Sequence, residues 1–114
     1  MTIEEAAFAI ILHAGNARAE AYAAIEKARQ AEFAEAEERL GRAREELRAA
    51  HQVQTDLIQK EAAGQGVPPS LLLIHAQDHL MTASAELSLA EQMVALCRRL
   101  AALEGRLGGA RADG

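Results

Sequence analysis

The sequence predicts an all-α protein in which three long helices run up, down and up as one antiparallel bundle. Alanine, leucine, glutamate and arginine dominate its 114 residues, which is a composition typical of helices. Apolar residues recur at steps of three and four, and no stretch shows the alternation of a β-strand. Glycine and proline mark one clear loop, at residues 64–69, between the second helix and the third.

The first helix is expected to begin after Thr2, because Glu4 and Glu5 place acidic side chains in a first turn where the helix dipole favours them. The helical pattern then continues to about Gln30. Its apolar residues lie on two sides, which indicates neighbours on both. Gly15 interrupts the pattern at a cost of about 1 kcal/mol relative to alanine, so it predicts either a close backbone approach or a local break.

The second helix is expected to begin at Phe33, after a short turn at Ala31 and Glu32, and to end at the glycines of the loop. The charged residues along it are typical of a solvated face and suggest no function. One face keeps the alternating spacing of a packing seam, formed by Phe33, Ala36, Leu40, Ala43, Leu47, Ala50, Gln54 and Leu57.

The third helix is expected from about Pro69 to Leu107. Its first half is apolar nearly all round, which indicates burial on more than one side. The first of two apolar faces consists of Leu72, His75, His79, Thr82, Glu86, Leu89, Met93, Leu96, Leu100, Leu103 and Leu107. The second consists of Leu73, Leu80, Leu87 and Val94. Two partner helices in one small chain would leave such a helix partly uncovered, so we expect further copies of the chain to cover it.

Residues 1–107 are therefore expected to form a single domain, and residues 108–114, which carry glycine and charge, a flexible C-terminal tail. The net charge of −5 argues against a nucleic-acid-binding protein, which needs a basic surface. The chain shows no apolar run long enough to span a membrane and no signal-peptide pattern, so a cytoplasmic location is the default expectation. Cys97 is alone, which rules out an internal disulfide and favours a structural role.

The third helix carries a block of polar side chains on its first apolar face. His75, Asp78, His79 and Thr82 follow one another at helical spacings of three and four, so they share one side of the helix. Burying such groups costs several kcal/mol, on the order of 2–7, unless they are paired. A purely structural helix would carry leucine here, so the block is the candidate functional site.

The spacing alone leaves three interpretations of this block open. Buried histidines can fix the register of a helical oligomer. His75 and His79 could also share a metal ion, although a zinc protease would need glutamate where Ala76 stands, and no carboxylate is placed as an obvious third ligand. A neutral imidazole could finally accept a phosphoryl group and pass it on. His13 and His51 suit a structural role better, although each could line the same site.

Three stretches resemble one family, the lactose/cellobiose (chitobiose)-type IIA components of the bacterial phosphoenolpyruvate sugar phosphotransferase system. LLLIHAQDHLMTASAEL, residues 71–87, is similar to the active-site helix of that family. HAGNARAEAYAAIEKARQAEFAEAEERL, residues 13–40, and AREELRAAHQVQTDLIQKEAAG, residues 43–64, resemble its first two helices. The resemblance covers roughly Ile10 to Leu103, and its specific part is the HxQDHLMT core.

The resemblance implies a homotrimer, in which three three-helix protomers form a nine-helix bundle. It implies that His75, the first histidine of the motif, takes phosphate from phospho-HPr as a phosphohistidine intermediate. The phosphate then passes to the cysteine of a IIB component and on to a β-linked disaccharide that enters through the membrane IIC component. Gln77 and His79 match other polar positions of the motif and are candidates for supporting roles. The implied protein is a phosphotransferase-system intermediate and not a complete sugar kinase.

Asp78 matches the family's aspartate that meets its symmetry mates at the trimer axis, where Mg²⁺ or another divalent cation is expected. Three carboxylates at one axis repel one another unless they are protonated or share a cation, and hard divalent ions prefer oxygen ligands. The sequence does not name the sugar among lactose, cellobiose, chitobiose and others, because the IIB and IIC partners choose it. A structural helical oligomer and a metal-binding bundle remain the alternative functions.

Overall fold

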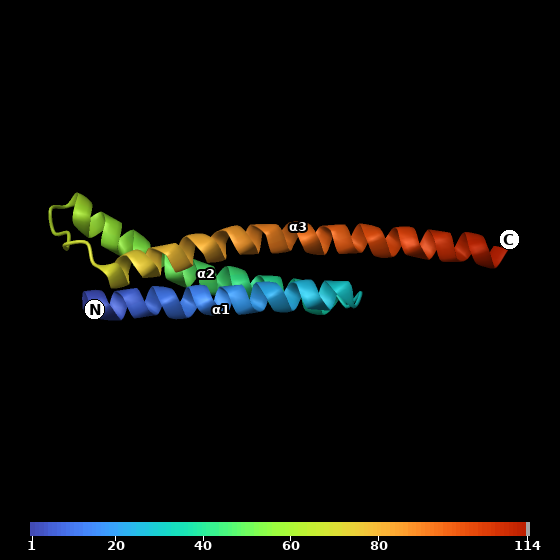
Figure 1. Cartoon of the computed structure of the whole chain (residues 1–114), viewed down its shortest axis with the longest axis horizontal. Coiled ribbons are helices and arrows are strands. Elements are labelled where there is room, and N and C mark those ends of the chain that lie inside the picture. Colours follow the sequence, from blue (N-terminus) through green and yellow to red (C-terminus); the bar gives the residue numbers. More distant parts are fainter. Residues whose placement is uncertain (114) are drawn as a thin grey trace.

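The computed structural model describes the backbone of residues 1–113 and the side chains of residues 1–109, and it consists of three helices (Figure 1). Helix α1 spans Ile3–Arg29, α2 spans Phe33–Ala62 and α3 spans Leu71–Asp113. Helices α1 and α3 run in the same direction, and α2 runs back between their ends (Figure 1). The predicted up-down-up bundle is confirmed, as a rod of 72 × 19 × 19 Å.

Side-chain caps fix where two of the helices begin. The Thr2 hydroxyl accepts a hydrogen bond from the backbone N–H of Glu5 at 3.1 Å, and the Glu5 carboxylate accepts from the N–H of Thr2 at 3.4 Å. This capping box confirms the expected start of α1. The Ser70 hydroxyl accepts from the N–H of Leu73 at 3.1 Å, so α3 begins just after the two prolines. The HxQDHLMT motif therefore lies close to a capped helix end.

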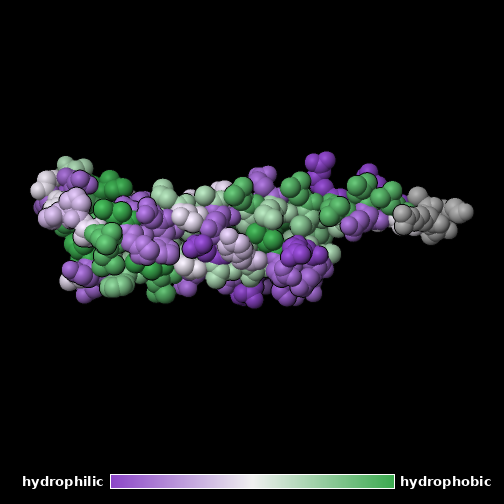
Figure 2. Space-filling view, in the orientation of Figure 1, coloured by the Kyte–Doolittle hydropathy of each residue, from purple (hydrophilic) through white to green (hydrophobic). Residues whose placement is uncertain are grey.

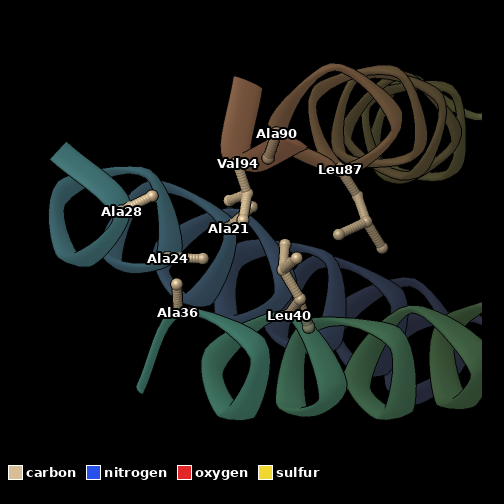
Figure 3. Close-up of a cluster of buried hydrophobic side chains, with 9 residues drawn as sticks. Ala21, Ala24, Ala28, Ala36, Leu40, Leu87, Ala90 and Val94 are labelled. Carbon is tan, nitrogen blue, oxygen red and sulfur yellow. The ribbon is translucent and has the colours of Figure 1, made fainter. Parts of the chain in front are cut away.

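The core is built mainly from alanine. Three helices contribute to the larger cluster, with Ala21, Ala24 and Ala28 from α1, Ala36, Leu40 and Ala43 from α2, and Leu87, Ala90 and Val94 from α3 (Figure 3). Small side chains let helix backbones approach closely, so a thin apolar core still packs densely. The seam predicted for α2 faces this core throughout, since each of its residues is buried or half-buried.

The two apolar faces of α3 have different surroundings. Leu80, Leu87 and Val94 of the second face are buried within the chain. Most of the first face is open, with Leu89, Met93, Leu96, Leu100, Leu103 and Leu107 each about half exposed. Figure 2 shows apolar surface along the part of α3 that projects beyond the other two helices. In a single chain the first face is therefore a surface and not a buried seam.

Two local expectations differ from the structure. Helix α1 passes through Gly15 without a break, and no atom lies within 4 Å of the position of an added Cβ there. Helix α3 also continues to Asp113, beyond the expected end near Leu107. Gly108 and Gly109 thus lie inside a helix and do not end it. The flexibility expected of residues 108–114 stays a prediction, and Gly114 lies outside the described residues.

Candidate functional site

The inner face of α3 anchors the helical turn that carries the motif. Ala76 and Leu80 are fully buried against Ala7 and Ile10 of α1 and Ala50 of α2. Residues three and four apart share one side of a helix, so burial of Ala76 and Leu80 leaves His75, Asp78 and His79 on the other sides of α3. The histidines of the motif accordingly lie on the outer side of a rigidly held turn.

His75 and His79 contact each other directly. Their Nε2 atoms are 3.1 Å apart, and the two rings meet edge to face at 86° with centroids 4.5 Å apart. A neutral imidazole has one N–H donor and one acceptor nitrogen, so this contact requires one ring to donate and the other to accept. His75 is exposed and His79 is half-buried. The exposed ring of His75 can therefore meet a protein partner while the half-buried ring of His79 holds the Nε2 atom of His75.

Gln77 points toward α2 and away from the histidine pair. Its side-chain oxygen accepts a hydrogen bond from the Gln54 amide at 2.9 Å, and both residues are half-buried. Sequence reasoning counted Gln54 only as a member of the α2 seam. A polar residue at a seam position was the signal that it has a partner, because buried amides are normally hydrogen-bonded.

The remaining polar residues of the first apolar face, together with Asp78, separate into two groups. Asp78 and Thr82 are exposed. Glu86 instead accepts a hydrogen bond from Nε of Arg18 on α1 at 3.0 Å. This hydrogen bond and the charge of the carboxylate raise the pKa of Arg18 above its ordinary value. Glu86 is thus a link between α1 and α3, whereas Asp78 remains available to a partner.

Within residues 1–109, no three histidine, cysteine, aspartate or glutamate side chains come together as a metal site. His75 and His79 supply two nitrogen ligands at most, and a zinc centre needs three or four protein ligands. A single Asp78 carboxylate fits a divalent cation only as one of several oxygen ligands. The described residues of one chain therefore do not form the expected metal site. Asp78 could bind a cation only if other copies of the chain supply the remaining ligands.

His13 and His51 take no part in the hydrogen bond between the two motif histidines. Nδ1 of His13 is 2.7 Å from a carboxylate oxygen of Glu46, which links α1 to α2. His51 is half-buried on α2 beside Ala50 of the core. The pairing of His13 with Glu46 agrees with the structural role expected for His13, and the role of His51 stays a prediction.

The surface around His75 is apolar. Leu71, Ile74 and Met81 are each more than half exposed and lie within about two turns of His75 on α3. Exposed apolar side chains beside a functional group are typical of a surface for binding proteins.

No helix in the described part of the chain is long and apolar enough to cross a membrane.

The chain matches the family described as "PTS system, Lactose/Cellobiose specific IIA subunit" over residues 5–98. A galactose-specific EIIA component of Lactococcus lactis subsp. cremoris is 47% identical over 85% of this chain and 84% of its own length. The cellobiose-specific enzyme IIA of Bacillus anthracis superposes with a TM-score of 0.85 at 45% identity, over 90% of this chain and 94% of that one. The chitobiose IIA in an HPr complex from Escherichia coli gives 0.77 at 38% identity, over 88% and 97%.

Proposed function

We propose, because the chain belongs to the lactose/cellobiose-specific IIA family of the phosphotransferase system, that it carries a phosphoryl group on His75 between two protein partners. The exposed imidazole of His75, held by His79 within the family's motif, is the observation that carries this proposal. A phosphocarrier needs a nucleophile that two partners can reach in turn, and His75 meets that need. A structural oligomer or a metal-binding bundle would give no reason for the match to phosphotransferase-system IIA components.

The donor is phospho-HPr, since a solved relative forms a complex with HPr. In the first transfer a bond forms from phosphorus to a nitrogen of His75 while the bond from phosphorus to the donor breaks. In the second, the cysteine thiolate of a IIB component attacks the phosphorus and the bond to His75 breaks. Such transfers depend mostly on positioning and on stabilising the charge of the phosphoryl oxygens.

His79 has a supporting role in this mechanism. In the tautomer that the mechanism requires, Nε2–H of His79 donates to the lone pair of His75 Nε2, which is the nucleophile. The hydrogen bond breaks as this lone pair attacks the phosphorus, which frees Nε2–H of His79 to donate to a phosphoryl oxygen. A hydrogen bond to a charged oxygen is roughly twice as strong as a neutral one. His79 is therefore a positioning residue before the transfer and a donor after it.

Three copies of the chain form the active assembly. The exposed apolar face of α3 supplies the contact, because leucines that are half exposed in one chain become buried when three such helices meet. Asp78 lies on this side, N-terminal to the leucines, so three carboxylates approach at the axis. Mg²⁺ or another divalent cation bound there would neutralise their charge, as the chemistry of the carboxylates favours.

The transported sugar is a β-linked disaccharide, selected by the IIB and IIC partners. Relatives and structural neighbours at 38–47% identity carry the names of three different sugars: galactose, cellobiose and chitobiose. A component that contacts only proteins has no sugar pocket to diversify, so similar IIA chains can serve different sugars. The IIA step itself is therefore the same reaction for each.

Intact mass spectrometry after incubation with phosphoenolpyruvate, enzyme I and HPr tests the carrier function. The parent chain should gain one phosphoryl group that is stable in alkali and lost in mild acid, and His75→Ala should gain none. His13→Ala serves as a matched control, because its histidine pairs with Glu46 and should leave the phosphoryl group in place. Absence of phosphate on the parent while HPr itself is phosphorylated would overturn the proposal.

A further inference from the structure

The separation of the His75 and His79 rings fits two ligands of one metal ion. Their Nε2 atoms lie 3.1 Å apart and face each other, with the ring planes at 86°. Imidazole nitrogens bind Zn²⁺ at about 2.0–2.1 Å, so two of them at the tetrahedral angle are separated by about 3.4 Å. The two side chains therefore need to move apart by only about 0.3 Å to hold a zinc ion between their nitrogens.

Water can complete the coordination of an ion at this pair. His75 is exposed and His79 is half-buried, so solvent reaches the two nitrogens from outside the bundle. Two protein ligands are fewer than a permanent zinc centre has. An ion that is held by two imidazoles and completed by water is therefore bound reversibly.

The charges near the pair also favour a cation. The sequence contains no lysine or arginine in residues 1–17, 49–59 and 61–97. These ranges include all the buried residues of the cluster in which Ala76 and Leu80 anchor the motif. Asp78 is exposed on the same turn as the histidines. An ion between the two imidazoles is thus not repelled by a lysine or arginine of these segments.

We infer that the His75–His79 pair is also a reversible Zn²⁺ site, and that zinc bound there blocks phosphorylation of His75. The lone pair of His75 Nε2 that attacks phosphorus is the same one that binds the ion, so each event excludes the other. Binding requires the proton of His79 to stand on Nδ1 in place of Nε2, because both Nε2 atoms must offer a lone pair. Both rings stay neutral in this exchange. The block rests on the proposed carrier function, whereas the binding rests on the geometry of the pair.

The chemistry of the ligands separates this site from the cation proposed at Asp78. Imidazole nitrogen suits Zn²⁺, whereas Mg²⁺ prefers carboxylate and water oxygens. Mg²⁺ should therefore neither bind the histidine pair nor displace zinc from it. Excess Mg²⁺ in an experiment then occupies sites made of oxygen ligands and leaves the histidine pair to zinc.

Calorimetric titration of the full chain with ZnCl₂ in excess Mg²⁺ tests the site. The parent should bind one zinc ion per chain. His79→Ala should bind zinc more than about tenfold more weakly, because losing a ligand costs at least as much as losing a hydrogen-bond partner of a ligand. His13→Ala is the matched control and should bind zinc as the parent does, because His13 pairs with Glu46. Equal affinities of the parent and His79→Ala would overturn the site.

Purified phospho-HPr then tests the block. Zinc at about ten times its dissociation constant should slow phosphorylation of the parent about tenfold, since only the zinc-free fraction reacts, and a chelator should restore the rate. The slower reaction of His79→Gln, which lacks one ligand, should fall no more than about twofold at the same zinc concentration. Zinc that binds the parent without slowing its phosphorylation would overturn the block. A parent that is not phosphorylated even without zinc would overturn the proposed function instead, and the titration would still decide whether the zinc site exists.

Discussion

At the scale of single residues, the contact between His75 and His79 couples the tautomers of the two rings. Their Nε2 atoms, 3.1 Å apart, share one hydrogen bond, so exactly one proton arrangement leaves a lone pair on His75 Nε2 and a donor on His79. The i,i+4 spacing alone predicted that the two rings share a helix face. It could not predict that they would touch, because the side-chain rotamers depend on packing against α1 and α2.

His79→Ala should slow phosphorylation of His75 by phospho-HPr by about 100- to 1000-fold, the range known for the loss of one charge-stabilising donor. His79→Gln keeps a donor at nearly the same distance from the backbone and should recover part of the rate. Stopped reactions analysed by intact mass would give these rates. A His79→Ala chain that is phosphorylated as fast as the parent would show that His79 has only a packing role.

Gln77 and Gln54 illustrate what sequence reasoning leaves out at this scale. The motif identified Gln77 as a candidate for support, but the structure directs its side chain to Gln54 and away from the histidine pair. The partner comes from another helix, and no spacing within α3 contains that information. Within one chain, Gln77 joins α3 to α2 beside the histidine pair.

At the scale of helices, the local signals in the sequence predicted most of what the structure contains. Thr2 and Phe33 mark the starts of α1 and α2, because capping and periodicity are local properties. The predicted end of α3, near Leu107, was wrong by several residues, because Gly108 and Gly109 were taken to terminate the helix. Glycine weakens a helix without forbidding it, and only a left-handed residue or a broken hydrogen-bond pattern ends one.

The turn between α1 and α2 offers a prediction about stability. Ala31 has φ 61°, a left-handed conformation that costs a residue with a Cβ about 1–2 kcal/mol. Ala31→Gly should therefore raise the free energy of unfolding by about 0.5–1 kcal/mol, after the greater chain entropy of glycine is subtracted. Ala95→Gly, on an exposed and helical position of α3, should lower it by about 1 kcal/mol. Denaturant titrations would compare the variants, and a destabilised Ala31→Gly chain would refute the argument.

At the scale of the whole molecule, the sequence predicted two apolar faces on α3 but not which partner each would meet. Both faces carry leucine at heptad spacing, so periodicity alone cannot predict which of them packs against α1 and α2. The alanines of α1 determine which face of α3 packs inside the chain, because only the face with Ala83, Ala90 and Val94 can approach them closely. The other face, which runs from Leu72 to Leu107, is left for partners. An uncovered apolar face of this length argues for assembly more strongly than composition does.

The proposed trimer leads to a specific prediction about Asp78. Asp78→Leu should keep or strengthen the trimer, because it removes three mutually repelling carboxylates and extends the apolar face of α3. A chelator should weaken the parent trimer if a divalent cation bridges the carboxylates, and it should leave the Asp78→Leu trimer unchanged. Asp56→Leu, an exposed carboxylate on α2, is the matched control and should not alter association. Sedimentation of the three proteins with and without chelator would decide, and a monomeric Asp78→Leu chain would contradict the axial placement.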